Sequence, residues 1–243
     1  MSRVASILQP SYLPWLGAFD QMARSEVFVF LDDVQYTKND WRNRNRIKSA
    51  GGASWLAVPV RTSGRSGQSI RDAEIEGGAW RRKHWRAISQ AYSKAPHWNR
   101  YSDEIDGLLD SDWTRISELD IAVTRWMADA FGIEVEFRVS SELGVEADDP
   151  NERLLAVLEA VGADEWYEGA AGASYVDLER FRRHGVRVRF QDYSHPEYPQ
   201  LWPRHGFISH LSALDLLLNC GPDGLSILLS GGAGGPEPRD GGR

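Results

Sequence analysis

The sequence predicts an α/β fold with a mostly parallel, Rossmann-like sheet. Two segments, Val4–Leu8 and Val27–Leu31, are continuous apolar runs rich in β-branched and aromatic residues, which is typical of strands covered on both faces. Strand-like and helix-like segments alternate along the chain, as they do in parallel sheets with helical crossovers. A chain of 243 residues is also long enough to bury a sizeable core.

The first half of the chain is expected to form a strand-loop-helix-strand unit followed by a helical insertion. The helix Trp15–Arg24 would join the first two strands by a right-handed crossover. The insertion covers residues 78–131, and its last helix has an apolar stripe and a stop at Gly132. The other elements expected here are the strand Trp55–Val60, with Pro59 at an edge or strand end, the flexible loop Arg61–Gly67, and the helices Trp80–Ser93, Tyr101–Leu109 and Thr114–Phe131.

The second half has clearer element boundaries. Asp149 is predicted to cap a helix with Pro150 in its first position, and Ser174 to cap a later one. The expected elements are the strands Ile133–Val139, Asp164–Tyr167 and Val186–Phe190, and helices over 151–161, 174–184 and 211–219. Residues 1–229 are therefore expected to form one domain, and residues 230–243 a disordered tail rich in Gly and Pro.

Composition excludes several classes of protein. The net charge of −7 argues against a general nucleic-acid binder, and the single Cys220 excludes an internal disulfide framework. No apolar run reaches the roughly 20 residues of a membrane-spanning helix, and the apolar N-terminal run is too short for a signal peptide. A cytoplasmic protein is therefore expected, and a homo-oligomer is compatible with the composition.

Several segments of unusual composition resemble the WbqC-like family. They are QPSYLPWLGAFD, FLDDVQYTKNDWRNRNRIK and WLAVPV, followed by YEGAAGASYVDLERF, GVRVRFQDY, YPQ and FISHLSALDLLLNCG. The resemblance extends over about residues 4–228, with departures at Ala18, where the pattern often has Tyr, and near Ser209, where it has Pro. It implies a cytoplasmic protein of a bacterial O-antigen, other glycan or specialised-metabolite pathway, but it implies no particular reaction.

Ligands of parallel sheets bind at the carboxyl ends of strands, where this chain has four polar or aromatic segments. The first, Gln9–Trp15, occupies the place where HUP-type enzymes hold nucleotide phosphates, but it has no histidine. We expect it to bind substrate rather than to act only as a packing corner. The residues expected to take part are Gln9, Pro10, Tyr12 and Trp15.

The second segment joins two carboxylates to a basic stretch. Asp32 and Asp33 end a strand, so only one should face the cleft; it could accept a proton, or form an Asx turn or pair with arginines. Lys38–Lys48 has five positive charges against one negative, which favours docking of an anion over a solvated loop. The substrate-binding residues expected here are Tyr36, Trp41, Arg42, Asn43, Arg44, Asn45 and Lys48.

The remaining two segments give weaker predictions. The turn at residues 168–174 could offer backbone N–H groups to an anion, or could simply require small residues. The candidates in these segments are Gly169, Gly172, Tyr175, Tyr198 and Gln200. No metal site is expected, because His205 and His210 are not spaced to share a helical face; no cofactor is evident. His84 is expected to be a partly exposed interaction residue rather than a catalyst, and the role of His195 stays open.

These features predict a group-transfer enzyme, with an acyl, aminoacyl or amide-forming reaction among the options. Its substrate would be a small anionic molecule such as a nucleotide-linked sugar, or a small amine, in bacterial glycan or specialised-metabolite biosynthesis. One alternative is an ATP-using enzyme of nucleotidyl-transfer type. A second alternative is a non-catalytic scaffold for pathway enzymes.

Overall fold

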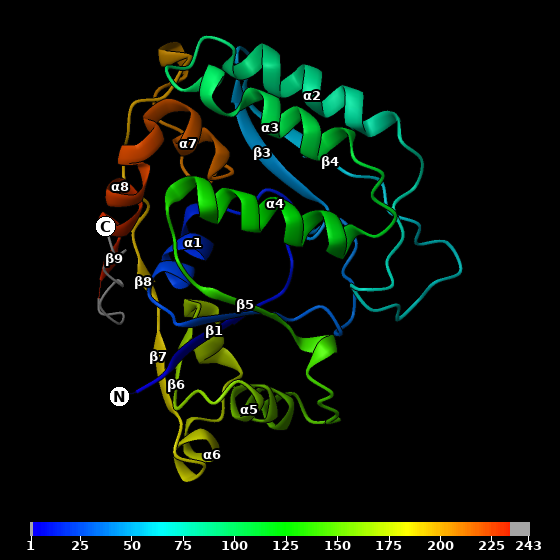
Figure 1. Ribbon diagram of the computed structural model, residues 1–243, viewed down its shortest axis with the longest axis vertical. Helices are drawn as coiled ribbons and strands as arrows, with labels where there is room; N and C mark the ends of the chain where they lie inside the picture. The colour runs from blue at the N-terminus through cyan, green and yellow to red at the C-terminus, as the bar shows by residue number, and fades with distance from the viewer. Residues whose placement is uncertain (1, 234–243) are drawn as a thin grey trace.

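A computed structural model, which describes residues 2–233, has a central sheet of five parallel strands in the order β5-β2-β1-β6-β7 (Figure 1). These strands are β1 (Val4–Leu8), β2 (Val27–Phe30), β5 (Glu136–Val139), β6 (Glu165–Glu168) and β7 (Arg187–Phe190). Numbered along the chain within this sheet, the order is 3-2-1-4-5, which matches the first five strands of the Rossmann order 3-2-1-4-5-6. The predicted α/β, Rossmann-like fold is confirmed.

Helices cover both faces of this sheet, which explains its continuous apolar strands. On one face lie α1 (Leu16–Ala23), α4 (Ile116–Phe131), α7 (Leu214–Cys220) and α8 (Gly224–Ser230); on the other lie α5 (Pro150–Ala160) and α6 (Leu178–Arg183) (Figure 1). Successive side chains of β2 point to opposite faces of the sheet, so this strand contributes residues to both hydrophobic cores. Phe28 and Phe30 belong to the larger core with α1 and α4, whereas Val27 and Val29 belong to the smaller core with α5.

The insertion is helical, as predicted, and it packs on a β-hairpin that the sequence did not reveal. It contains α2 (Ala79–Tyr92) and α3 (Trp98–Asp110), and α2 lies against the hairpin of β3 (Arg44–Ser49) and β4 (Gly52–Ala57) (Figure 1). The expected strand Trp55–Val60 therefore starts and ends earlier than predicted. The basic stretch Lys38–Lys48 consists of turns up to Asn43 and of the strand β3 from Arg44 onward, in which Asn45 and Ile47 are buried and Arg44 and Arg46 are half-buried.

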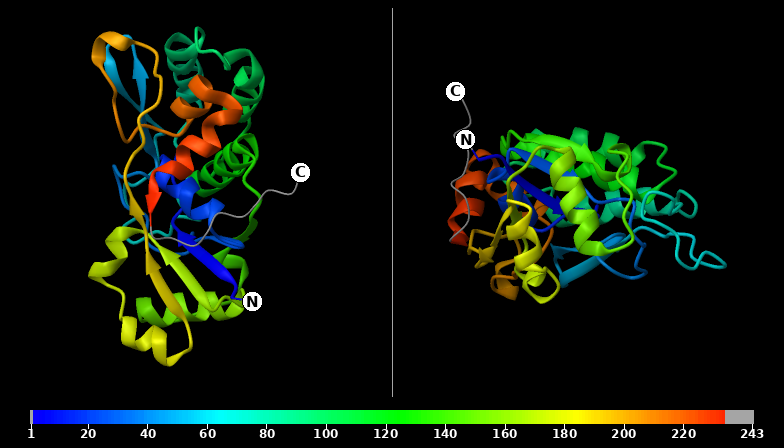
Figure 2. Two further views of the ribbon diagram at one scale, coloured as in Figure 1. Left: turned by 90° about the vertical axis from the view of Figure 1, so that its left-hand side faces the viewer. Right: turned by 90° about the horizontal axis from the view of Figure 1, so that it is seen from below.

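The C-terminal part contains elements beyond the predicted last helix. Ser230 still belongs to α8, and β9 (Gly232–Ala233) pairs with β8 (Asp192–Tyr193), so the start of the expected tail is ordered. Residues 234–243 of that tail lie outside the described residues. The long segment after β8 runs to the hairpin (Figure 2). There, Nε2 of His205 lies 2.9 Å from the carbonyl oxygen of Ala50.

Helix ends test the predicted caps directly. Asp149 accepts a hydrogen bond from the backbone N–H of Glu152 at 2.9 Å, and Gly132 ends α4 with φ 75°, both as predicted. Ser174 does not cap α6, because residues 170–174 form a 3₁₀ turn and Asp177 accepts from the N–H of Arg180 at 3.1 Å instead. The other 3₁₀ turns are at Ser140–Glu142, Pro203–His205 and Gly221–Asp223.

Within residues 2–233, none of the helices is at once long enough and apolar enough to cross a membrane.

Candidate functional site

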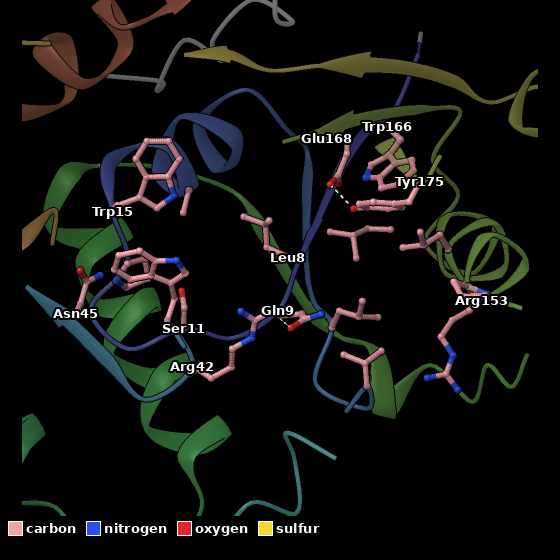
Figure 3. Close-up of a pocket in the computed structure, with 18 of the residues that line it drawn as sticks. Leu8, Gln9, Ser11, Trp15, Arg42, Asn45, Arg153, Trp166, Glu168 and Tyr175 are labelled. Atoms are coloured by element: carbon pink, nitrogen blue, oxygen red, sulfur yellow. Dashed lines mark hydrogen bonds between the residues drawn. The ribbon is translucent and has the colours of Figure 1, made fainter. Parts of the chain in front are cut away.

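A cavity of about 630 Å³ opens at the carboxyl ends of β1 and β6 (Figure 3). The chain order reverses between these two strands, and such a switch point is where α/β sheets bind ligands. Their pairing is limited to Val4 with Glu165 and Ala5 with Trp166. Farther along, the hydroxyl of Ser6 donates to the carbonyl of Tyr167 at 2.8 Å, so a side chain replaces the ladder bond where the strands separate.

The cavity has a polar side and an apolar side. The polar side is formed by the loop after β1 and by the stretch that leads into β3: Gln9, Ser11, Trp15, Trp41, Arg42 and Asn45. The apolar side faces α5 and the smaller core, and its residues are Ile7, Leu31, Pro150, Leu154 and Trp166. Arg153, Glu168, Tyr175 and His210 complete the polar part of the wall.

The backbone of the loop Gln9–Trp15 is held by hydrogen bonds to other segments. The N–H of Tyr12 donates to the carbonyl of Trp41 at 2.9 Å, and the amide of Asn45 donates to the carbonyl of Leu13 at 2.6 Å. Leu13 has φ 48°, a left-handed conformation that a leucine seldom adopts. This loop presents Trp15 to the cavity, where its ring stacks on His210 with 5.6 Å between centroids.

We expect Gly17→Ala to disturb the cavity without touching a ligand directly. A Cβ at Gly17 would lie 2.3 Å from the Trp15 ring, so the ring would have to move. The substitution should lower the free energy of unfolding by about 1–3 kcal/mol. Gly107→Ala on α3 is the matched control, because a Cβ there meets nothing within 4 Å and should stabilise the helix by roughly 0.5–1 kcal/mol. Equal melting temperatures of the two variants would contradict the tight fit.

Two arginines lie on the wall of the cavity. Arg42 pairs with Asp40 at 2.6 Å and donates a second hydrogen bond to the side-chain oxygen of Gln9. Arg153 pairs with Asp33 at 3.5 Å. Figure 3 shows Arg42 beside Gln9 near the centre and Arg153 at the α5 end. The guanidinium groups are thus both oriented by acceptors and able to bind anionic parts of a ligand.

Glu168 is the buried acid of this cavity. It ends β6, is 5% exposed, and accepts a hydrogen bond from the Tyr175 hydroxyl at 2.8 Å through Oε1 (Figure 3). Its Oε2 has no hydrogen-bond partner within the described part of the chain. Burial raises the pKa of Glu168 to about 7, although the hydrogen bonds from Tyr175 and from the Gly169 backbone act to lower it.

Gly172 allows Glu168 to occupy this position. A Cβ at Gly172 would lie 2.4 Å from Cγ of Glu168. The N–H of Gly172 donates to the carbonyl of Gly169 at 2.9 Å, and the N–H of Tyr175 to the carbonyl of Gly172 at 3.1 Å. These bonds within the turn use N–H groups that were expected to bind an anion, so Gly172 serves to make room for the carboxyl group.

Comparison of the chain with known proteins identifies its family. The WbqC-like protein family matches residues 9–227, a range that includes the Gln9 loop, Arg42, Glu168 and Tyr175. The chain belongs to the WbqC-like protein family. It is also 39% identical over 225 residues to the uncharacterized protein Rv1507c of Mycobacterium tuberculosis strain H37Rv, covering 92% of this chain and 96% of that protein. No solved structure is significantly similar.

Six of the predicted binding residues lie on the cavity wall: Gln9, Trp15, Trp41, Arg42, Asn45 and Tyr175. Other predicted binding residues are buried behind the residues that line the cavity. Tyr12 is fully buried and its hydroxyl bonds to Nδ1 of His84 at 2.9 Å. His84 is 5% exposed and not partly exposed as predicted, and this burial lowers its pKa to about 4. The structural residues that do not line this cavity are Pro10, Tyr12, Tyr36, Asn43, Gly169 and Gly172.

Arg44 and Lys48 do not face the cavity either. The guanidinium of Arg44 lies 4.6 Å from the ring centre of the exposed Trp55. Lys48 is 1% exposed, and its ammonium donates to Gln200 Oε1 at 3.1 Å and to the carbonyl of Gly206 at 2.6 Å. Lys48 and Gln200 thus fasten the segment after β8 to the hairpin. Tyr198 is buried beside Phe207 and also lies outside the cavity wall.

Asp32 and Asp33 lie beyond the end of β2, and the Ser140 hydroxyl is within hydrogen-bond distance of both carboxylates, at 3.1 and 2.6 Å. Their side chains therefore converge on one group and do not point to opposite faces as predicted. Asp32 accepts hydrogen bonds from the N–H and hydroxyl of Ser141, at 3.1 and 2.9 Å, and lines a separate hollow beside α4. Asp33 accepts from the Ser140 hydroxyl at 2.6 Å and orients Arg153. Neither carboxylate is part of the cavity wall. The acid that faces the cavity is Glu168, which the sequence showed only as the start of a turn.

Proposed function

We propose that this protein is a group-transfer enzyme whose reaction takes place in the cavity between β1 and β6. Glu168 acts as the general base that removes a proton from an amine or hydroxyl nucleophile. The observation that carries this proposal is the buried carboxyl group of Glu168, whose Oε2 has no partner among the described residues while it lies on the wall of a switch-point cavity. In this proposal Glu168, and not Asp32 or Asp33, accepts the proton.

The surroundings of Glu168 suit proton transfer at neutral pH. A general base is most effective when its pKa lies near the working pH, and the pKa of Glu168 is raised to about 7. Tyr175 holds one carboxyl oxygen, and the other oxygen is buried without a hydrogen-bond partner among the described residues, so its lone pairs are not used by the protein. The rings of Trp15 and Trp166 limit the access of water to the same space.

The substrate that we propose is a small anionic molecule, such as a nucleotide-linked sugar of a bacterial glycan or specialised-metabolite pathway. Arg42 supports this class, because it is held by Asp40 and Gln9 and still lies on the cavity wall. Planar guanidinium groups bind phosphate and carboxylate through two parallel hydrogen bonds. Asn45, Ser11 and Gln9 add polar groups on the same side for sugar hydroxyls.

A thermal-shift series tests the proposal. UDP-N-acetylglucosamine at a hundredfold excess over its Kd should stabilise the wild-type protein by about 2.7 kcal/mol, and ATP at the same concentration should stabilise it less, because its Kd should be higher. A response to ATP alone would instead favour the nucleotidyl-transfer alternative. The absence of any response to a panel of nucleotide-linked sugars and amino sugars would contradict the proposed substrate class.

A further inference from the structure

We infer that the apolar side of the cavity holds an aliphatic acyl group, so that the group transferred is an acyl chain delivered as a thioester to an amine. This inference rests on the proposed function, because it assigns a donor to the same site. The side in question is formed by Ile7, Leu31, Pro150, Leu154 and Trp166.

The two sides of the cavity differ in what they are able to bind. The polar side has the amide and hydroxyl groups of Gln9, Ser11 and Asn45. The apolar side has aliphatic side chains and the Trp166 ring, which continue directly into the smaller core, where Leu154 is 8% exposed and Trp166 is fully buried. Sugar hydroxyls or phosphates placed against Ile7, Leu31 and Leu154, out of reach of Arg153, would lose their hydrogen bonds to water without replacement, which is costly, whereas alkyl groups would gain from burial.

Glu168 lies where the two sides meet. In Figure 3 its carboxyl group lies at the upper edge of the cavity beside Trp166 and Tyr175, with Trp15 toward one end and Arg153 toward the other. A donor with its alkyl chain on the α5 side would place its carbonyl carbon close to this carboxyl group. An amine bound on the polar side would approach from the opposite direction, so that Glu168 could reach the proton that must leave.

The transfer that follows from this placement is balanced without a redox partner. The amine nitrogen attacks the thioester carbonyl carbon, and the new C–N bond forms as the C–S bond breaks. Glu168 takes the proton from the nitrogen and then gives it to the departing thiolate sulfur. The products are an amide and a free thiol, and the carboxylate returns to its starting state.

The test uses S-acyl-N-acetylcysteamine thioesters from acetyl to octanoyl as probes, with Kd measured by titration calorimetry on the full chain. Each added methylene should tighten binding by about fourfold until the apolar side is filled. Leu154→Ser and Leu31→Ser should flatten this dependence on chain length. Leu178→Ser is the matched control, since Leu178 is on α6, 52% exposed, and absent from the cavity wall.

The outcomes separate this inference from the proposed function. A Kd that is the same for all chain lengths would overturn the acyl assignment, as would a steep dependence that persists in both serine variants. If UDP-N-acetylglucosamine still binds and requires Arg42, only the acyl assignment fails. If neither class of probe binds, the proposed function fails with it. Melting temperatures show whether each variant is folded, and the wild-type series is decisive even where a variant is not.

Discussion

Replacing Glu168 with glutamine is expected to lower the kcat of the transfer reaction by about 10²- to 10⁴-fold, the usual contribution of a general base. Glutamine keeps an oxygen that can accept the Tyr175 hydrogen bond, and it has nearly the same volume, so substrate Kd should change little. Steady-state kinetics and calorimetric binding on the same protein preparation separate the two effects. A variant that retains wild-type kcat would remove Glu168 from the reaction.

The pH dependence of kcat/KM should follow the ionisation of Glu168. A general base works only when ionised, so kcat/KM should rise with pH through about 7 and then level off. Glu168→Gln should lose this step. A wild-type profile that is already flat between pH 5 and 8 would contradict the assignment.

The same substitution should stabilise the protein at alkaline pH. Burial raises the pKa of Glu168 from 4.5 to about 7, so between these values the folded state binds more protons than the unfolded state. Wild-type stability attributable to this group therefore falls as pH rises through that window. Glu168→Gln should be more stable than wild type by up to roughly 3 kcal/mol at pH 8, with little difference below pH 4.5. Glu197→Gln, at an exposed position, is the control for denaturant unfolding.

Replacing Arg42 with alanine should raise KM by about 10- to 100-fold, because a charge-assisted contact to an anion is lost. The loss also frees Asp40 and Gln9, the two groups that hold the guanidinium in place. kcat should change much less than KM, since the contact is present before and during the reaction.

Arg44→Ala is the matched control for Arg42→Ala. Arg44 is two residues away in the same basic stretch, but it stacks over the exposed ring of Trp55 and is not part of the cavity wall. Its KM should stay close to the wild-type value. Equal effects of the two substitutions would show that the basic stretch acts only through its overall charge.

The sequence predicted the elements whose signals are local. Continuous apolar runs identified β1 and β2, and Asp149 with Pro150 identified the start of α5. The β3–β4 hairpin was missed because Asn45 occupies a buried strand position, where it bonds to the carbonyl of Leu13. A polar residue in that position hides the alternation that would otherwise indicate a strand.

The sequence predicted where in the fold the candidate site lies, but it did not predict which carboxyl group faces the cavity. The carboxyl ends of the strands indicated the right edge of the sheet, and the Gln9 loop and Arg42 do lie on the cavity wall. Glu168 was missed as a chemical group because its raised pKa depends on burial by distant segments and on the space left by Gly172. Lys48 was predicted to bind substrate, but it is buried, and its partners Gln200 and Gly206 are more than 150 residues away in the chain.

The ionisation of Glu168 is the most direct test of this account, and it requires no knowledge of the substrate. Carbon-13 NMR of the glutamate side-chain carboxyl groups, with Glu168→Gln for assignment, would follow its titration in the folded protein. A midpoint near 7 would support a buried base poised for proton transfer. A midpoint near the ordinary glutamate value of 4.5 would contradict it.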